Sequence, residues 1–288
     1  MPLDTQQFGI SRYWLSTAIK NIPSTPDVFV PSKQLSQARK LFLAGKNQLS
    51  AIRNWLVTAG VVEAGRGQVK LTELGQLMAS QDPKAETALT WWLFHLHLCT
   101  NPDAFPYSIF FLQYDSEGRW MSFDDVIDAL AKHADDKQLN ITKDTVSTYF
   151  GGVIQTFQAG GFVHEMGLIE QRTVGDGRGS RKVRRRLGKP DDLLVAYAAV
   201  LLQKQFYSGQ ATVEARELLG KGLARILGLR DSDVREALSR ITTHKELSLY
   251  VQYRQQVNQD SIQFMRTAEA TLKEIRTSGY RSQVVKWQ

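Results

Sequence analysis

The chain lacks several features that would narrow its function at once. It has a single cysteine, Cys99, in 288 residues, so neither an internal disulfide nor a cysteine-based zinc site can form. The longest uninterrupted apolar run covers residues 193–202, which is about half of what a bilayer crossing needs. The N-terminal sequence has neither the basic start nor the apolar core of a signal peptide. These absences predict a soluble cytoplasmic protein with no membrane partner.

The sequence also lacks the motifs of the common enzyme classes. No HExxH, Walker A motif, dinucleotide fingerprint or Ser/His/Asp order is present. His95 and His97 lie two residues apart, so on a helix they cannot share a metal, and we expect both to be structural. Asp124, Asp125 and Asp128 cluster at a predicted helix start, where the helix dipole favours acids. The alternative is that acids converge on a metal, so a divalent ion is expected only if the chain nicks DNA.

Positive charge is in excess and partly clustered. The chain carries 36 Lys and Arg against 29 Asp and Glu, a net charge of +7, which suits an anionic partner such as nucleic acid. Segment 171–189 has one acid, Asp176, and eight cations: Arg172, Arg178, Arg181, Lys182, Arg184, Arg185, Arg186 and Lys189. So many like charges repel one another unless an anion neutralises them. The segment therefore predicts a phosphate-binding hairpin, and the alternative is an ordinary solvated surface.

Residues 45–77 indicate a winged helix. Apolar residues recur at helical spacing between positions 49 and 59 and predict one buried stripe. The other face would present possible DNA contacts: Lys46, Asn47, Ser50 and Asn54, with Arg53 on its flank. Two short apolar runs around a glycine-flanked turn then predict a hairpin over 61–71 with Arg66 at its tip. This unit is predicted to contact nucleic acid, and the alternative is a scaffold or protein-binding role.

The predicted fold class is mainly α. We expect an N-terminal winged helix-turn-helix, a second helix-turn-helix with a basic β-hairpin, and a C-terminal helical region. The helical segments of that last region are predicted near 191–207, 212–228, 231–243 and 246–277. The predicted domains are 1–80 (winged helix), 81–122 (helical linker), 123–190 (second winged-helix-like unit) and 191–288 (helical).

The N-terminal third resembles a known bacterial family. Its motifs are Gly45-Lys46-Asn47, Ile52-Arg53, Trp55-Leu56, Ala59-Gly60-Val61-Val62, Leu71-Thr72, Leu74-Gly75, Asp82-Pro83 and Trp91-Trp92-Leu93-Phe94-His95. As a set over residues 8–100 they are similar to a domain family encoded beside phosphorothioation genes. That family includes the B component of the single-stranded DNA phosphorothioation (Ssp) defence system.

The resemblance implies a DNA-binding role in antiphage defence. Family members work with a cysteine desulfurase, an ATPase and a sulfurtransferase, and the B component is associated with DNA nicking. This chain has Thr5-Gln6-Gln7 where the family has His-Glu-Thr before a phenylalanine, although Phe8, Arg12 and Trp14 match. The resemblance thus implies a DNA-binding component of a system that nicks DNA. Because that His and Glu are replaced, we expect this chain to nick DNA weakly or not at all without partner subunits. The alternative is a non-enzymatic winged-helix transcriptional regulator or protein adaptor.

Overall fold

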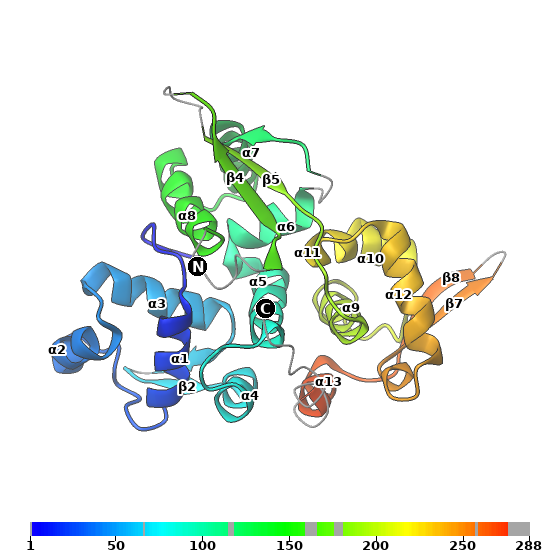
Figure 1. Ribbon diagram of the computed structural model, residues 1–288, viewed down its shortest axis with the longest axis horizontal. Coiled ribbons are helices and arrows are strands. Elements are labelled where there is room, and N and C mark those ends of the chain that lie inside the picture. Colours follow the sequence, from blue (N-terminus) through cyan, green and yellow to red (C-terminus); the bar gives the residue numbers. More distant parts are fainter. Residues whose placement is uncertain are drawn as a thin grey trace.

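The structure is a computed structural model of the chain. It describes residues 2–65, 67–114, 118–158, 166–175, 181–256 and 259–275, without the side chains of residues 31–35, 256 and 259. Two predicted DNA contacts, Arg66 and Arg178, lie outside the described residues. The fold is mainly helical with small antiparallel sheets, as predicted, and Figure 1 shows three lobes around a central helix.

The first lobe contains the predicted helix and hairpin. Its elements are α1 (Arg12–Asn21), α2 (Pro31–Phe42), α3 (Lys46–Thr58), β1 (Val62–Ala64), β2 (Val69–Leu71) and α4 (Glu73–Gln81). The stripe on α3 is buried, and Gly60 ends the helix with a φ of 66°. Strands β1 and β2 pair antiparallel, and the Val69 amide donates to the carbonyl of Pro26 at 2.8 Å. The predicted helix and hairpin are thus confirmed.

The centre of the molecule is formed by α5 (Ala88–Thr100), followed by η1 (Pro102–Ala104) and α6 (Tyr107–Gln113). The α5 sequence is apolar on all sides, and the helix packs against α6 and against α9 of the third lobe. Trp91, Leu93 and Phe94 on α5 are buried, and the Phe94 ring contacts the rings of Trp55 and Trp91. A helix of this composition is stable only when it is covered on most faces, which explains its central place.

The second lobe contains β3 (Met121–Ser122), α7 (Phe123–Asp136), α8 (Lys143–Thr156), β4 (Ile169–Thr173) and β5 (Arg181–Arg185). The sheet order is β3-β5-β4, with β5 antiparallel to both neighbours. The side chains of Ser122 and Thr142 accept the amides of Asp125 and Thr145, so they cap α7 and α8. The helix pair and the hairpin expected between 123 and 190 are therefore present.

The third lobe differs from its prediction. Its elements are α9 (Asp192–Phe206), β6 (Thr212–Glu214), α10 (Ala215–Gly220), α11 (Leu223–Leu227), α12 (Asp231–Thr243), η3 (Leu247–Leu249), β7 (Val251–Gln256), β8 (Gln259–Phe264) and α13 (Ala268–Glu274). The single helix predicted over 246–277 is wrong, because β7 and β8 form a hairpin in the middle of that segment and a helix, α13, follows only at Ala268–Glu274. Val251 and Tyr253 alternate with polar residues and point into the core, as a half-buried strand requires.

The second and third lobes share one order of elements. In each, a helix precedes a short strand, a set of helices and an antiparallel hairpin, and the second strand of the hairpin lies between the other two strands. The sheet orders are β3-β5-β4 and β6-β8-β7. Within the described part of the chain, no helix is long and apolar enough to cross a membrane.

Candidate nucleic-acid interface

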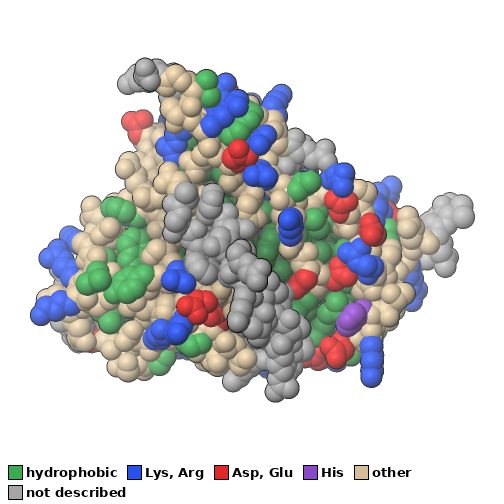
Figure 2. Space-filling model, in the orientation of Figure 1, with side chains coloured by type: hydrophobic (Ala, Val, Ile, Leu, Met, Phe, Trp, Pro, Cys, Tyr) green, Lys and Arg blue, Asp and Glu red, His purple; other side chains and the backbone are tan. Residues whose placement is uncertain are grey.

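The exposed side of the β3-β5-β4 sheet gathers positive charge. Strand alternation puts Lys182 and Arg184 on one face of β5, and the register places Arg172 opposite Lys182 on β4. Arg186, next after β5, reaches the same side, because its guanidinium lies 3.5 Å from Glu170. Figure 2 shows Lys and Arg side chains clustered over this hairpin, at the top of the molecule. We call Arg172, Lys182, Arg184 and Arg186, together with Trp120, the basic sheet face.

Trp120 organises the basic sheet face. The guanidinium carbons of Arg172 and Arg184 lie 4.1 Å and 4.6 Å from the centroid of its ring. Such cation–π contacts hold long side chains in place while leaving their N–H groups able to bind anions. The sequence prediction missed Trp120, because β3 is too short to show alternation.

One carboxylate lies among these cations. Glu170 accepts from Arg184 through Nε at 2.9 Å and Nη2 at 2.6 Å. Arg172 and Lys182 form no ion pair with any residue that the structure describes. Four cations against one carboxylate leave three positive charges on the face, so it attracts anions.

The structure corrects the prediction that Arg185 contacts phosphate. This residue lies on the opposite face of β5 and is only 1% exposed. Its guanidinium donates to the carbonyls of Phe111, at 3.3 Å, and Tyr114, at 2.9 Å, and also to that of Arg225. The prediction that Arg185 contacts phosphate is therefore wrong, because its donors face backbone carbonyls in the core.

Arg181 also points inward. It is half-buried on the ring of Phe123, with 4.4 Å between the guanidinium carbon and the ring centroid. Burial lowers the pKa of its guanidinium. Arg181 lines a cleft beside α8 and lies on the side of β5 opposite Lys182 and Arg184.

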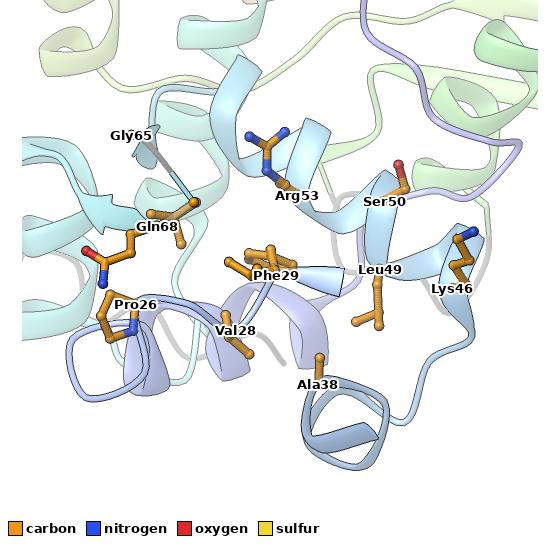
Figure 3. Close-up of a pocket in the computed structure, with 13 residues that line it drawn as sticks. Pro26, Val28, Phe29, Ala38, Lys46, Leu49, Ser50, Arg53, Gly65 and Gln68 are labelled. Atoms are coloured by element: carbon orange, nitrogen blue, oxygen red, sulfur yellow. The ribbon is translucent and has the colours of Figure 1, made fainter. Parts of the chain in front are cut away.

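The predicted contact face of α3 is partly available. Lys46, Asn47 and Ser50 are exposed and Arg53 is half-buried. The Asn54 amide nitrogen donates to the backbone carbonyl of Asp4 at 3.0 Å, so this side chain holds the N-terminal segment. Figure 3 shows Lys46, Ser50 and Arg53 at the edge of a groove beside the hairpin.

This groove has a volume of about 400 Å³ and an apolar floor. Val28 and Phe29 lie between the hairpin and the helices, and Leu49 points from α3 toward Ala38 of α2 (Figure 3). Two cations, Lys46 and Arg53, therefore lie beside an apolar opening at this end of the first lobe.

Residues 2–10 join the first and second lobes. The indole nitrogen of Trp55 on α3 donates to the carbonyl of Phe8 at 2.8 Å. On the other side, the buried Thr5 hydroxyl donates to the carbonyl of Tyr149 on α8 at 2.9 Å, and the Gly9 amide donates to the side chain of Gln155 at 2.8 Å. This segment, where the sequence departs from the resembled family, thus fixes α3 relative to α8.

Several arginines of the third lobe are paired with acids of the same lobe. Arg230 lies 3.0 Å from Asp233, Arg240 lies 2.7 Å from Asp192, and Arg235 pairs with Asp260. These pairs surround α12, so this helix offers less free positive charge than the basic sheet face.

The clustered acids of α7 lie in its first turn or form an ion pair with a neighbouring helix. Asp124 and Asp125 lie in the first turn of α7, and Asp128 forms an ion pair with Lys143. In the described ranges, no three His, Cys, Asp or Glu side chains come together as metal ligands.

His95 is buried and structural, as predicted. It lies 2.6 Å from the Tyr107 hydroxyl and 2.7 Å from the Ile226 carbonyl, and burial lowers its pKa to about 3. His97 contacts the Tyr197 hydroxyl through Nε2 at 2.8 Å, and burial lowers its pKa to about 4.

Comparison with known proteins relates the whole chain to one family and one fold. A family model described as a protein of unknown function (DUF4007) matches residues 5–280. No curated protein matches the sequence. A crystal structure of SspB superposes with a TM-score of 0.76 at 18% identity, covering 98% of this chain and 88% of that chain. A magnesium ion-bound crystal structure of SspB gives a TM-score of 0.75 at 19% identity, covering 98% and 89%. The chain therefore has the fold of these structures.

Proposed function

The chain belongs to the DUF4007 family, and from this membership, its SspB-like fold and its basic sheet face we propose that it is the DNA-binding component of a bacterial phosphorothioation-linked antiphage system. The basic sheet face is the observation that carries the proposal. It presents four cations and one carboxylate on a single side of a sheet, with two of the cations held on Trp120. Clustered cations of this kind bind the phosphate backbone and release its counterions.

We interpret the lobes as winged helices, and the recurring order of elements supports this. In such units the second helix of the pair enters the major groove. Those helices would be α3, α8 and α12, with Lys46, Asn47, Ser50 and Arg53 as contacts from α3. The proposed domains are 1–80, 81–122 and 123–190, and 191–288 becomes a third winged unit. Ion pairing around α12 favours DNA contact through the first two units.

The proposed partners follow from the family. A cysteine desulfurase, an ATPase and a sulfurtransferase would act with this chain on DNA in the cytoplasm. DNA nicking belongs to the same proposal, as an activity that needs those partner subunits. The described residues do not form a three-ligand metal site, so we derive no step through a metal ion.

A protein adaptor is the second candidate, and the groove of the first lobe favours it. The apolar floor formed by Val28, Phe29 and Leu49 would bury an apolar side chain. Lys46 and Arg53 beside it are complementary to carboxylates. The fitting partner is an acidic peptide segment with an apolar anchor.

Binding and cleavage assays test the proposal together. We expect the purified protein to retard a labelled duplex at low salt and to release it as salt rises. Supercoiled plasmid incubated with the protein and Mg²⁺ or Mn²⁺ should stay supercoiled. Absence of retardation would contradict the DNA-binding role. Open circles that disappear when Asp124, Asp125 or Asp128 is changed to Asn would contradict dependence on partners.

A further inference from the structure

A polar cleft of about 280 Å³ opens between α8, the N-terminal segment and the start of β5. Its polar lining comes from three parts of the chain: Gln7, Ser147, Gln155, Gln158 and Arg181. The lining also includes Gly151, which keeps the wall of α8 open, because a Cβ built there meets nothing within 4 Å.

The chemistry of this cleft is that of an anion site. No carboxylate is among its lining residues, and Arg181 forms no ion pair within the described part of the chain. Gln155 accepts the Gly9 amide through its oxygen at 2.8 Å, so its amide nitrogen is the group left to donate. A half-buried guanidinium without a counter-charge is unfavourable, and a bound anion would relieve it.

The cleft continues toward the basic sheet face. A wider depression of about 510 Å³ shares Gln158 and Arg181 with it and is also lined by Arg172, by Arg186 and by Glu170, which pairs with Arg186. An anionic chain lying on the basic sheet face would thus reach Arg181 without leaving a surface rich in donors. This continuity favours a polymer with repeated phosphates over an isolated small anion.

We infer that the Arg181 cleft binds one phosphodiester of a DNA strand whose neighbouring phosphates lie on the basic sheet face. This inference rests on the proposed DNA-binding role and adds a specific inner site to it. Arg181 supplies the charge, Gln155 and Ser147 supply donors, and Gln7 brings the N-terminal segment against the strand.

Gly151→Leu is the most selective variant for testing the cleft, because the leucine side chain fills the cleft without changing the charge of the protein. Gly151→Ala is its matched control, since a Cβ alone fits the open space. Binding of a labelled DNA is measured by anisotropy over a series of KCl concentrations. Gly151→Leu and Arg181→Gln should each reduce the magnitude of the slope of log K against log salt by about 0.7–0.9, the value of one phosphate contact. Gly151→Ala should keep the wild-type slope, and a wild-type slope for Gly151→Leu would overturn the inference.

A second measurement separates the cleft from the proposed function. Inorganic phosphate should raise the Tm of the wild type and of Gly151→Ala more than that of Gly151→Leu. If this difference is found but DNA does not bind, the cleft is an anion site and the proposed DNA-binding role is wrong. An equal rise in Tm in all three proteins would show a general salt effect and would contradict anion binding in the cleft.

Discussion

Arg185 places a permanent charge in the centre of the molecule. Its three carbonyl partners lie on α6, just after α6 and on α11, so one side chain ties the second lobe to the third. The Phe111 ring, 4.4 Å from the guanidinium carbon, completes the site. A charge held by several carbonyls and a ring is stable, but it leaves buried acceptors unsatisfied when it is removed.

Arg185→Gln should therefore lower the free energy of unfolding by about 3 kcal/mol, from lost charged hydrogen bonds and packing. The neighbouring Arg186→Gln is the control, because Arg186 is exposed and its pairing with Glu170 is partly solvated. It should change stability by less than about 0.5 kcal/mol. Denaturant unfolding measures both, and equal stability of the two variants would contradict the structural role of Arg185.

His95 makes stability depend on pH. Its Nε2 faces a carbonyl, which can only accept, so Nε2 carries the proton and Nδ1 accepts from Tyr107. The folded-state pKa is about 3, against 6.5 for an ordinary histidine. Below pH 6.5 the unfolded chain binds a proton that the folded chain does not. Stability from this group is thus complete above pH 6.5 and is lost progressively as the pH falls toward 3.

At pH 5 the expected loss from His95 is about 2 kcal/mol relative to pH 7. Denaturant unfolding across this pH range should show a steeper loss of stability for the wild type than for His95→Gln. The difference between the two slopes should approach one bound proton, about 1.4 kcal/mol per pH unit. Parallel pH profiles would mean that His95 is not the group responsible.

The positions of single residues were predictable where one periodicity dominated. On α3, helical spacing correctly separates buried Leu49 and Ile52 from exposed Lys46. On β5, period-two alternation with the buried Val183 already places Arg185 inward, but the run of like charges obscured it. The Asn54 contact with Asp4 was not predictable, because it joins residues far apart in the sequence.

Helix α8 carries two adjacent glycines with opposite constraints. A Cβ at Gly152 would lie 2.3 Å from the Thr5 hydroxyl oxygen, whereas a Cβ at Gly151 meets nothing within 4 Å. The close approach at Gly152 lets the N-terminal segment hydrogen-bond to the α8 backbone. The pair therefore separates the general cost of glycine in a helix from a specific packing requirement.

Gly151→Ala should raise the free energy of unfolding by about 0.5–1 kcal/mol, because alanine favours the helix. Gly152→Ala should lower it by about 1–3 kcal/mol, because the new Cβ must displace Thr5. Unfolding of the two single variants under the same conditions measures the contrast. A stabilised Gly152→Ala protein would show that the N-terminal segment does not pack on α8 in this way.

Sequence patterns predicted the helices and strands of the first two lobes better than those of the third. The first hairpin was predictable from its glycine-flanked turn, whereas the segment that forms β7 and β8 was predicted to be helical. Val251 and Tyr253 do alternate in strand fashion, but neighbouring helices on both sides and sparse apolar residues favoured helix. Pairing of β8 with β6, which is nearly fifty residues earlier in the chain, is a tertiary effect that local patterns do not contain.

Across the whole molecule, positive charge is placed unevenly. The net charge of +7 alone predicts general attraction to nucleic acid. Arg230 and Arg240 of the third lobe are paired with acids, whereas Arg172 and Lys182 on the basic sheet face have no ion pair in the described part of the chain. We therefore expect DNA affinity to depend on the place of a charge as well as on its sign.

The salt dependence of DNA binding tests this claim most directly. The double variant Arg172→Gln/Lys182→Gln removes two charges from the basic sheet face. Lys221→Gln/Lys245→Gln removes the same charge from the third lobe. Anisotropy titrations of one labelled duplex over a KCl series should show the slope of log K against log salt falling by nearly two for the first variant, at about 0.9 per phosphate contact. The second should keep the wild-type slope, and equal slopes for both variants would contradict a DNA-binding role of the basic sheet face.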